Sequence, residues 1–212
     1  MADLEFFFDP VCPFAWVTSR WVKEVQTQRN YDVTWRFISL AIINEKRTSD
    51  WYTPEYRAGH LTGTMALRVA DQVRRTEGND GVDRLYTALG TAFHVDRRRQ
   101  EMSDDPVPFL ETLLKGVDLD PQLAEHGLDE SHDATLRQET ELAFSRTGPD
   151  VGTPNLTFNP GSDREASFFG PVISKTPRGE EAVRLWDAVQ TLAETPSMSE
   201  LKRSARAKLD FT

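Results

Sequence analysis

The stretch FFFDPVCPFAW, residues 6–16, holds the only cysteine of the chain, Cys12, between an apolar run and a proline. The run Leu4–Phe8 is apolar at four of its five positions, as expected for a strand that is buried on both faces. Pro13 suits the first turn of a helix, where its missing N–H costs nothing, and apolar residues then recur at helical spacing to about Gln28. The sequence therefore predicts a strand, a short turn and a helix, with Cys12 at the helix entrance.

A second strand is predicted at residues 32–39, where Val33, Trp35 and Phe37 alternate with polar residues. This gives a β-α-β unit in about forty residues. A helical crossover of this kind joins parallel strands and is almost always right-handed. We therefore expect the first two strands to be parallel neighbours.

The middle of the chain, from about residue 54 to 146, is helical in character, because good helix formers dominate and β-like alternation is absent. Breaks are predicted at residues 78–81, 104–108 and 116–121, so three to five helices fit there. Two short strands are predicted after it, at Asn155–Phe158 and Ala166–Phe169. Thr176-Pro177 then predicts a last helix, with Thr176 as its N-cap.

The order of elements predicts an α/β fold in which one sheet carries a large helical insertion. We assign residues 1–50 and 148–212 to the sheet-containing domain and residues 51–147 to an all-helical insertion subdomain. Neither flank has a complete core alone, so two independent domains fit the pattern less well.

The totals exclude several classes of function. With 25 basic and 34 acidic side chains the net charge is −9, so nucleic acid and anionic membrane surfaces are not expected partners. The N-terminus does not have the pattern of a signal peptide, and no apolar run approaches the roughly 20 residues that cross a bilayer. A single cysteine cannot form an intrachain disulfide and is consistent with a reducing compartment, so we expect a cytoplasmic protein.

A cysteine at a helix entrance faces unpaired backbone N–H groups and the positive end of the helix dipole, which both favour thiolate. The dipole contributes roughly 0.3–1 kcal/mol, so we expect the pKa of Cys12 to lie about one unit below that of a free thiol, at about 7–8. The alternative is that Cys12 is a small buried apolar residue, the usual environment of a lone cysteine.

The Cys-Pro pair at the helix entrance, the helical insertion and the segment Val151-Gly152-Thr153-Pro154 before a strand resemble the thioredoxin fold as used in the DsbA family. Residues 39–45 (SLAIINE), 85–90 (LYTALG), 168–175 (FFGPVISK) and 177–181 (PRGEE) narrow the resemblance to the mycothiol-dependent nitroreductase branch of that family. These stretches span nearly the whole chain.

The resemblance implies that Cys12 is the attacking cysteine of a Cys-Pro-x-Cys motif. Pro13 and Phe14 complete the motif up to Ala15, which stands where the resolving cysteine would be. A dithiol enzyme releases its mixed disulfide with the second thiol, so any cycle here would be monothiol. The resemblance implies mycothiol as the external thiol, with glutathione as a possible substitute.

The resemblance also implies that the Thr153-Pro154 loop faces Cys12 with a cis proline and offers backbone groups to substrate. We add Trp16 and His60 as candidate substrate-binding residues, although aromatic side chains in a Phe-rich protein more often belong to the core. The four histidines, at positions 60, 94, 126 and 132, show no paired spacing, so no metal is expected. No glycine-rich phosphate loop is present in the sequence, so no nucleotide cofactor is expected.

Three functions remain open from the sequence. The first is a thiol-dependent oxidoreductase that uses Cys12 and an external thiol to reduce a disulfide or a nitroaromatic-type electrophile, with a redoxin as a possible protein partner. The second is a thiol-dependent transferase or isomerase, in which the cofactor's sulfur reacts and Cys12 only positions it. The third is a non-redox binding module that has lost the resolving cysteine.

Overall fold

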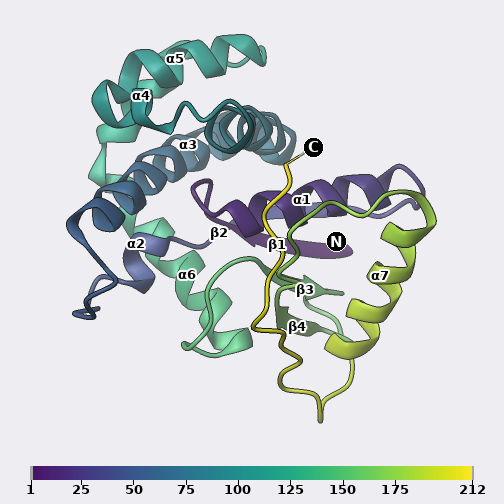
Figure 1. The fold of residues 1–212 in the computed structure, drawn as a ribbon. Helices are drawn as coiled ribbons and strands as arrows, with labels where there is room; N and C mark the ends of the chain where they lie inside the picture. The colour runs from purple at the N-terminus through teal and green to yellow at the C-terminus, as the bar shows by residue number, and fades with distance from the viewer. Residues whose placement is uncertain (1, 212) are drawn as a thin grey trace.

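The strand predicted at the start of the chain, β1 (Leu4–Phe8), lies inside a four-stranded mixed sheet of order β2-β1-β3-β4 (Figure 1). The computed structural model describes residues 2–211. β1 pairs in parallel with β2 (Val33–Phe37), as predicted, and antiparallel with β3 (Asn155–Phe158). β4 (Ala166–Phe169) extends the sheet antiparallel to β3.

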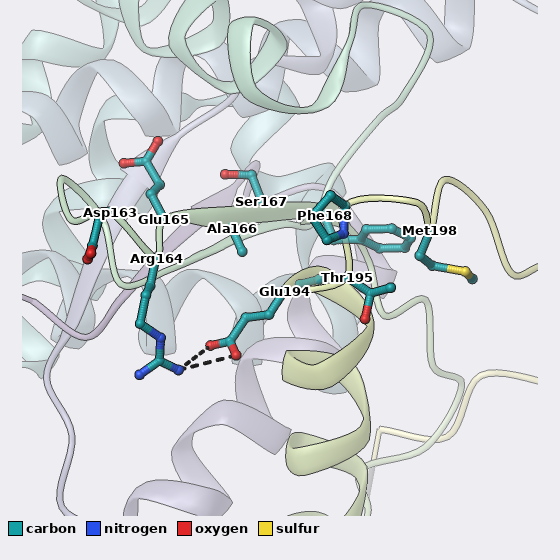
Figure 2. Close-up of a pocket in the computed structure, with 11 residues that line it drawn as sticks. Asp163, Arg164, Glu165, Ala166, Ser167, Phe168, Glu194, Thr195 and Met198 are labelled. Carbon is teal, nitrogen blue, oxygen red and sulfur yellow. Dashed lines mark hydrogen bonds and ion pairs between the residues drawn. The ribbon is translucent and has the colours of Figure 1, made fainter.

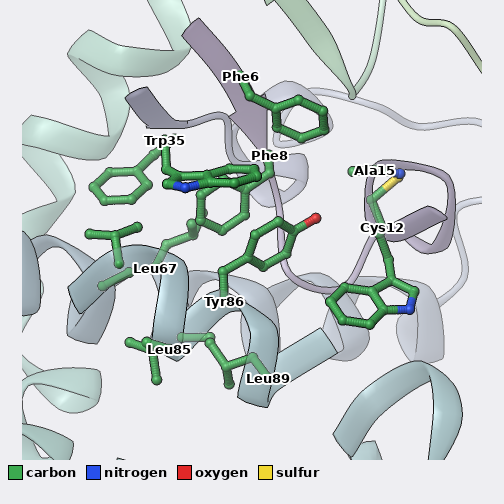
Figure 3. Packing of buried hydrophobic residues seen from close by; sticks show 14 of the residues in the cluster. Phe6, Phe8, Cys12, Ala15, Trp35, Leu67, Leu85, Tyr86 and Leu89 are labelled. Carbon is green, nitrogen blue, oxygen red and sulfur yellow. The ribbon is translucent and has the colours of Figure 1, made fainter. Parts of the chain in front are cut away.

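Helices cover both faces of β1, which explains its nearly continuous apolar sequence. Phe6 and Phe8 are fully buried in the main core, together with aromatic side chains such as Trp35 and Tyr86 (Figure 3). Phe7 points to the opposite face, where it forms a smaller cluster with residues such as Ala143. Because successive side chains of a strand alternate between its faces, one short strand anchors two cores.

The helical elements follow a simple plan. α1 (Pro13–Gln26) connects β1 to β2, and α7 (Gly179–Ala193) packs against it. Between β2 and β3 lie α2 (Leu40–Ile43), α3 (Pro54–Gly90), the π-helical turn η1 (Thr91–Val95), α4 (Arg99–Asp104), α5 (Pro106–Gly116), the 3-10 turns η2 (Pro121–Leu128) and η3 (Glu130–His132), and α6 (Asp133–Thr147). This arrangement confirms an α/β, thioredoxin-like fold with a large helical insertion.

The predicted break at residues 78–81 is a kink within one long helix. Gly78 has φ 71° and ψ −161° inside α3, a conformation that glycine adopts without steric cost. Asn79 on the next position ties this kink to β2, since its side chain accepts the N–H of Trp35 at 2.9 Å and donates to the carbonyl O of Val33 at 2.8 Å.

The predicted start of the last helix is wrong. α7 begins at Gly179 with Arg178 as its N-cap residue, and Thr176 does not cap it. Glu24 of α1 explains the later start: its carboxylate accepts the N–H of Gly179 at 3.0 Å and pairs with Arg178 at 3.0 Å. A tertiary contact thus satisfies the backbone donor that a local cap would otherwise satisfy.

No helix in the described residues 2–211 is both long enough and apolar enough to cross a membrane. Residues 1 and 212, the outer bounds of the domain division made from the sequence, lie outside the described part of the chain.

Gly90, at the end of α3, is needed because a Cβ there would lie 2.0 Å from the ring of Trp16. We expect Gly90→Ala to lower the free energy of unfolding by about 1–3 kcal/mol, the usual cost of overpacking a core. Gly116→Ala is the matched control, since a Cβ at Gly116 meets nothing within 4 Å. Urea unfolding measures both variants, and equal stabilities would contradict the close packing of α1 on α3.

Candidate active site

Cys12 is the N-cap residue of α1, as predicted. Its backbone is extended (φ −80°, ψ 112°), and its Sγ accepts the N–H of Ala15 at 3.4 Å. The Cys12 N–H donates to the carbonyl O of Asp9 at 3.0 Å, which closes the turn between β1 and α1. The thiol therefore lies at the helix N-terminus, one turn after the end of the central strand.

The loop that precedes β3 lies against the thiol. Cys12 Sγ donates to the carbonyl O of Thr153 at 3.4 Å across 141 residues of sequence. The Thr153-Pro154 peptide bond is cis, and the Thr153 hydroxyl donates to the carbonyl O of Phe7 at 3.0 Å. The fold thus brings together Cys12, Thr153 and Pro154, as the family resemblance implied.

The expected low pKa of Cys12 is wrong for this arrangement. The side chain is only 6% exposed, and its burial raises the pKa of the thiol to about 12. The N–H of Ala15 acts in the opposite direction, and the negative charge of Asp9 adds to the increase. The backbone N–H groups of Ala15 and Phe14 together do not offset the loss of hydration of the thiolate.

Asp9 is a site residue that the sequence analysis missed. Its carboxylate is fully buried and accepts the N–H of Val11 at 3.1 Å and that of Leu40 at 2.8 Å. Burial raises the pKa of Asp9 to about 7, although both hydrogen bonds and the charge of Arg99 act to lower it. A local sequence signal for this role of Asp9 was available. An aspartate before a proline accepts the backbone N–H of the residue two positions later, which forms an Asx turn.

His94 of η1 lies beside the same turn. Its Nε2 is 2.9 Å from the carbonyl O of Pro10, and because a carbonyl only accepts, Nε2 must carry the hydrogen. Burial lowers the pKa of His94 to about 4, so the ring is neutral at pH 7. It stacks between Trp16 at 6.2 Å and Phe211 at 5.7 Å, measured between ring centroids.

The C-terminal segment closes this side of the site. In Figure 1 it crosses α1 and ends beside α3, and Phe211 and Leu209 pack against the core cluster that contains Cys12. The N–H of Asp210 donates to the carbonyl O of Ser174 at 2.7 Å, and the Arg206 guanidinium lies 5.2 Å from the ring centroid of Phe14. The far end of the chain therefore lies against His94 and Phe14, two side chains beside the turn that holds Cys12.

The other predicted site residues occupy different environments. Pro13 begins α1, Phe14 is half-buried beside Cys12, and Ala15 is fully buried. Trp16 is only 3% exposed and packs into the core, which limits the surface that it offers to a substrate. His60 of α3 bonds through Nδ1 to the Tyr52 hydroxyl at 3.0 Å; within residues 2–211, none of its hydrogen bonds or ring contacts involves Cys12.

An open hollow of about 470 Å³ lies elsewhere, between β4 and the end of α7 (Figure 2). Its lining includes the ion pair of Arg164 with Glu194, with 3.1 Å between Nη2 and Oε1. It shares no residue with the surroundings of Cys12, and its lining combines exposed charged side chains such as Arg164 with half-buried apolar ones such as Phe168. We therefore locate the candidate active site at Cys12, in spite of its small exposed area.

Comparison with known proteins shows which family the chain resembles over most of its length. Residues 11–203 match the model of the Rv2466c-like family, described as mycothiol-dependent nitroreductase Rv2466c. The chain is also 31% identical over 211 residues to the uncharacterized protein Rv2286c of Mycobacterium tuberculosis, an alignment that covers 96% of this chain and 82% of that protein.

The raised pKa of Asp9 predicts a pH-dependent stability. The folded protein titrates Asp9 at about 7 and the unfolded chain near 3.8, so the folded state binds more protons in that window. The unfolding free energy of the wild type should therefore fall as pH rises from 4 to 7.5, relative to Asp9→Asn, by up to about 4 kcal/mol. Urea unfolding across this range measures the difference.

The histidines are the same in the wild type and in Asp9→Asn, so their contribution cancels in the difference between the two unfolding free energies. Asn also accepts fewer hydrogen bonds than the carboxylate, but this loss does not depend on pH. The exposed Asp163→Asn should leave the pH dependence of the wild type unchanged. A difference between wild type and Asp9→Asn that stays constant with pH would contradict the raised pKa.

The stacking of Phe211 predicts that the C-terminal segment limits access to the thiol. An aromatic pair contributes about 0.5–1.5 kcal/mol, so Phe211→Ala should raise the rate of Cys12 alkylation by iodoacetamide roughly 2- to 10-fold. Leu201→Ala, at an exposed position of the same segment, is the control. Intact mass against time gives both rates, and equal rates would show that the thiol opens by another route.

Proposed function

Because the chain belongs to the Rv2466c-like family of mycothiol-dependent nitroreductases, we propose that it is a DsbA-like thiol reductase that uses Cys12 with an external low-molecular-weight thiol of the mycothiol type. The observation that carries this proposal is the position of Cys12 Sγ at the N-terminus of α1, 3.4 Å from the carbonyl O of the residue before cis-Pro154. The proposed substrate is a disulfide or a nitroaromatic-type electrophile, reduced in the cytoplasm, where a free thiol persists.

The surroundings of Cys12 fit an external thiol because the protein has no second thiol of its own to resolve an adduct. Ala15, one turn into α1, presents a buried methyl group where a resolving thiol would stand. On either side of the sulfur, the N–H of Ala15 can donate to thiolate and the carbonyl O of Thr153 can accept from a bound molecule. When bound, mycothiol would supply the second thiol of the reaction.

The proposed chemistry begins with loss of the Cys12 S–H proton to solvent, which breaks the bond to the Thr153 carbonyl and leaves the sulfur with the Ala15 N–H. The thiolate attacks one sulfur of a disulfide, the S–S bond breaks, and the released thiolate takes up a proton. An external thiol then attacks the mixed disulfide at its outer sulfur and regenerates Cys12. This step leaves one half of the substrate as a mixed disulfide with the external thiol, and a second external thiol attacks that disulfide and releases the half as a free thiol. In total, two external thiols lose two electrons and form one disulfide, and the substrate disulfide gains the two electrons and becomes two thiols.

Exposure of the thiol is the step that this protein controls. Burial is the largest cause of the pKa of about 12, so a movement that exposes the sulfur to water should lower the pKa of Cys12 and also admit the substrate. After that movement the helix dipole and the Ala15 N–H act on a hydrated sulfur and favour thiolate. The closed state therefore protects the thiol between turnovers.

The burial of Cys12 also favours a second function, the thiol-dependent transferase or isomerase, in which the external thiol reacts and Cys12 only positions it. The two functions differ in whether Cys12 becomes covalently modified. If the protein only binds the external thiol, its intact mass would show no covalent adduct on Cys12 at any stage.

The test is the intact mass of the protein after incubation with oxidised mycothiol, or with oxidised glutathione, from pH 5 to 9. The proposal predicts one adduct on wild-type protein, faster formation at higher pH, and no adduct on Cys12→Ser. Turnover of a nitroaromatic or disulfide substrate with reduced thiol should fall at least about 100-fold in Cys12→Ser, as expected when a nucleophile is lost.

Ala15→Cys tests the missing resolving step. This variant should release the adduct without added thiol by forming a disulfide between Cys12 and the introduced thiol, whereas Ala15→Ser, of similar size, should retain the adduct. If Cys12→Ser keeps full activity, the transferase or isomerase function replaces the proposed one. If neither adduct nor turnover is seen in any variant, the protein is a non-redox binding module.

A further inference from the structure

A cluster of His126, Asp129 and His132 lies in the helical insertion, on the 3-10 turns η2 and η3 and the residue that joins them. Their donor atoms all lie within 4.8 Å of one another. On 3-10 turns every third residue returns to the same side, so positions i, i+3 and i+6 can converge. The spacing of six residues between His126 and His132 is therefore compatible with a shared site on these turns.

The distances suit a small cation with nitrogen and oxygen ligands. His126 Nδ1 lies 3.1 Å from His132 Nε2, and Asp129 Oδ2 lies 3.8 Å from the first and 3.9 Å from the second. Donor atoms around a tetrahedral zinc ion lie about 3.3–3.5 Å apart, given metal–ligand lengths of about 2.0–2.2 Å. Shifts of a few tenths of an ångström would thus complete the geometry, and the half-exposed Asp129 side chain can move that far.

His132 is already oriented as a metal ligand. Its Nδ1 lies 2.8 Å from Oδ2 of Asp71, and both side chains are at most 2% exposed. Asp71 also pairs with Arg74 at 2.8 Å and Arg75 at 2.6 Å, so it is a carboxylate and accepts the Nδ1–H. The lone pair of His132 is therefore on Nε2, which points into the cluster, and a carboxylate behind a ligating histidine is the usual supporting arrangement.

The third ligand and the backbone are also held in place. Asp129 caps η3 through Oδ1, which accepts the N–H of Ser131 at 2.9 Å, and this leaves Oδ2 toward the two rings. Arg68 of α3 donates to the carbonyl O of Gly127 at 3.2 Å and is paired at 2.7 Å with Asp133. The loop is thus fixed to α3. The charge of Arg68, the main cation beside the cluster, is already neutralised by Asp133.

We propose that His126, Asp129 and His132 bind a divalent transition metal of the zinc type. The donor set, two imidazoles and one carboxylate, is one that zinc accepts, and the partial exposure of His126 and Asp129 leaves a fourth position for water. The bound ion joins η2 to η3, and the contact of His132 with Asp71 connects the site to α3. The site shares no residue with the Cys12 site, so the test of metal binding does not depend on the proposed function.

The alternative is an N–H···N hydrogen bond between the two rings, which the same 3.1 Å distance allows. The test uses the full chain carrying Cys12→Ser, so that the thiol cannot bind metal, stripped with EDTA and titrated with Co²⁺ and Zn²⁺. We expect one equivalent of Co²⁺ to give the visible absorption bands of four-coordinate cobalt, Zn²⁺ to displace it, and Zn²⁺ to raise the melting temperature.

In the same background, His126→Ala should weaken Zn²⁺ binding by at least about 10- to 100-fold, the loss usual for a supporting group alone. Asp129→Asn keeps the cap on Ser131 but removes the charge and should also weaken binding. Glu130→Gln, the neighbouring acid outside the donor set, should bind as the parent does. No Co²⁺ bands, or Zn²⁺ binding that is equal in all variants, would overturn the proposal and leave the hydrogen bond as the explanation.

Discussion

The position of β1 between two strands and under helices on both faces is the constraint on which the rest of the structure depends. Its phenylalanines fill two cores at once, so the strand can shift neither along its neighbours nor between faces without exposing aromatic surface. The turn that follows it is therefore fixed in space. Cys12 lies at the end of this turn, so its position is fixed as well, and α1 begins directly after it.

The buried Asp9 carboxylate fixes the conformation of the turn between β1 and α1. It bonds the N–H of Val11 on its own side and that of Leu40 at the start of α2, so a single side chain holds together the ends of β1 and β2. The same burial that makes these bonds strong also disfavours the charges of Asp9 and Cys12. The site thus combines well-placed groups with suppressed ionisation.

Much of the fold could be predicted from local patterns of apolar residues in the sequence. The strand at Leu4–Phe8, the helix opened by Pro13, and the two late strands were predictable because burial on a regular element leaves a periodic apolar pattern. The start of α7 was not predictable in this way, since Glu24 of α1 supplies the contact that fixes it. The convergence of His126, Asp129 and His132 was also hidden, because short 3-10 turns have no long periodic pattern to detect.

The sequence by itself determined the order of the elements, the place of Cys12 at a helix entrance and the absence of a second thiol, because each depends only on residues close together in the chain or on its composition. The tertiary structure decided what surrounds the thiol: Asp9 from the strand end and Thr153 from a loop 141 residues away. The C-terminal segment lies against the neighbouring side chains of His94 and Phe14. The pKa of a group is set by its hydration and by charges in space rather than along the sequence. For this reason the sequence located the sulfur, while only the folded chain determined that it is buried and protonated.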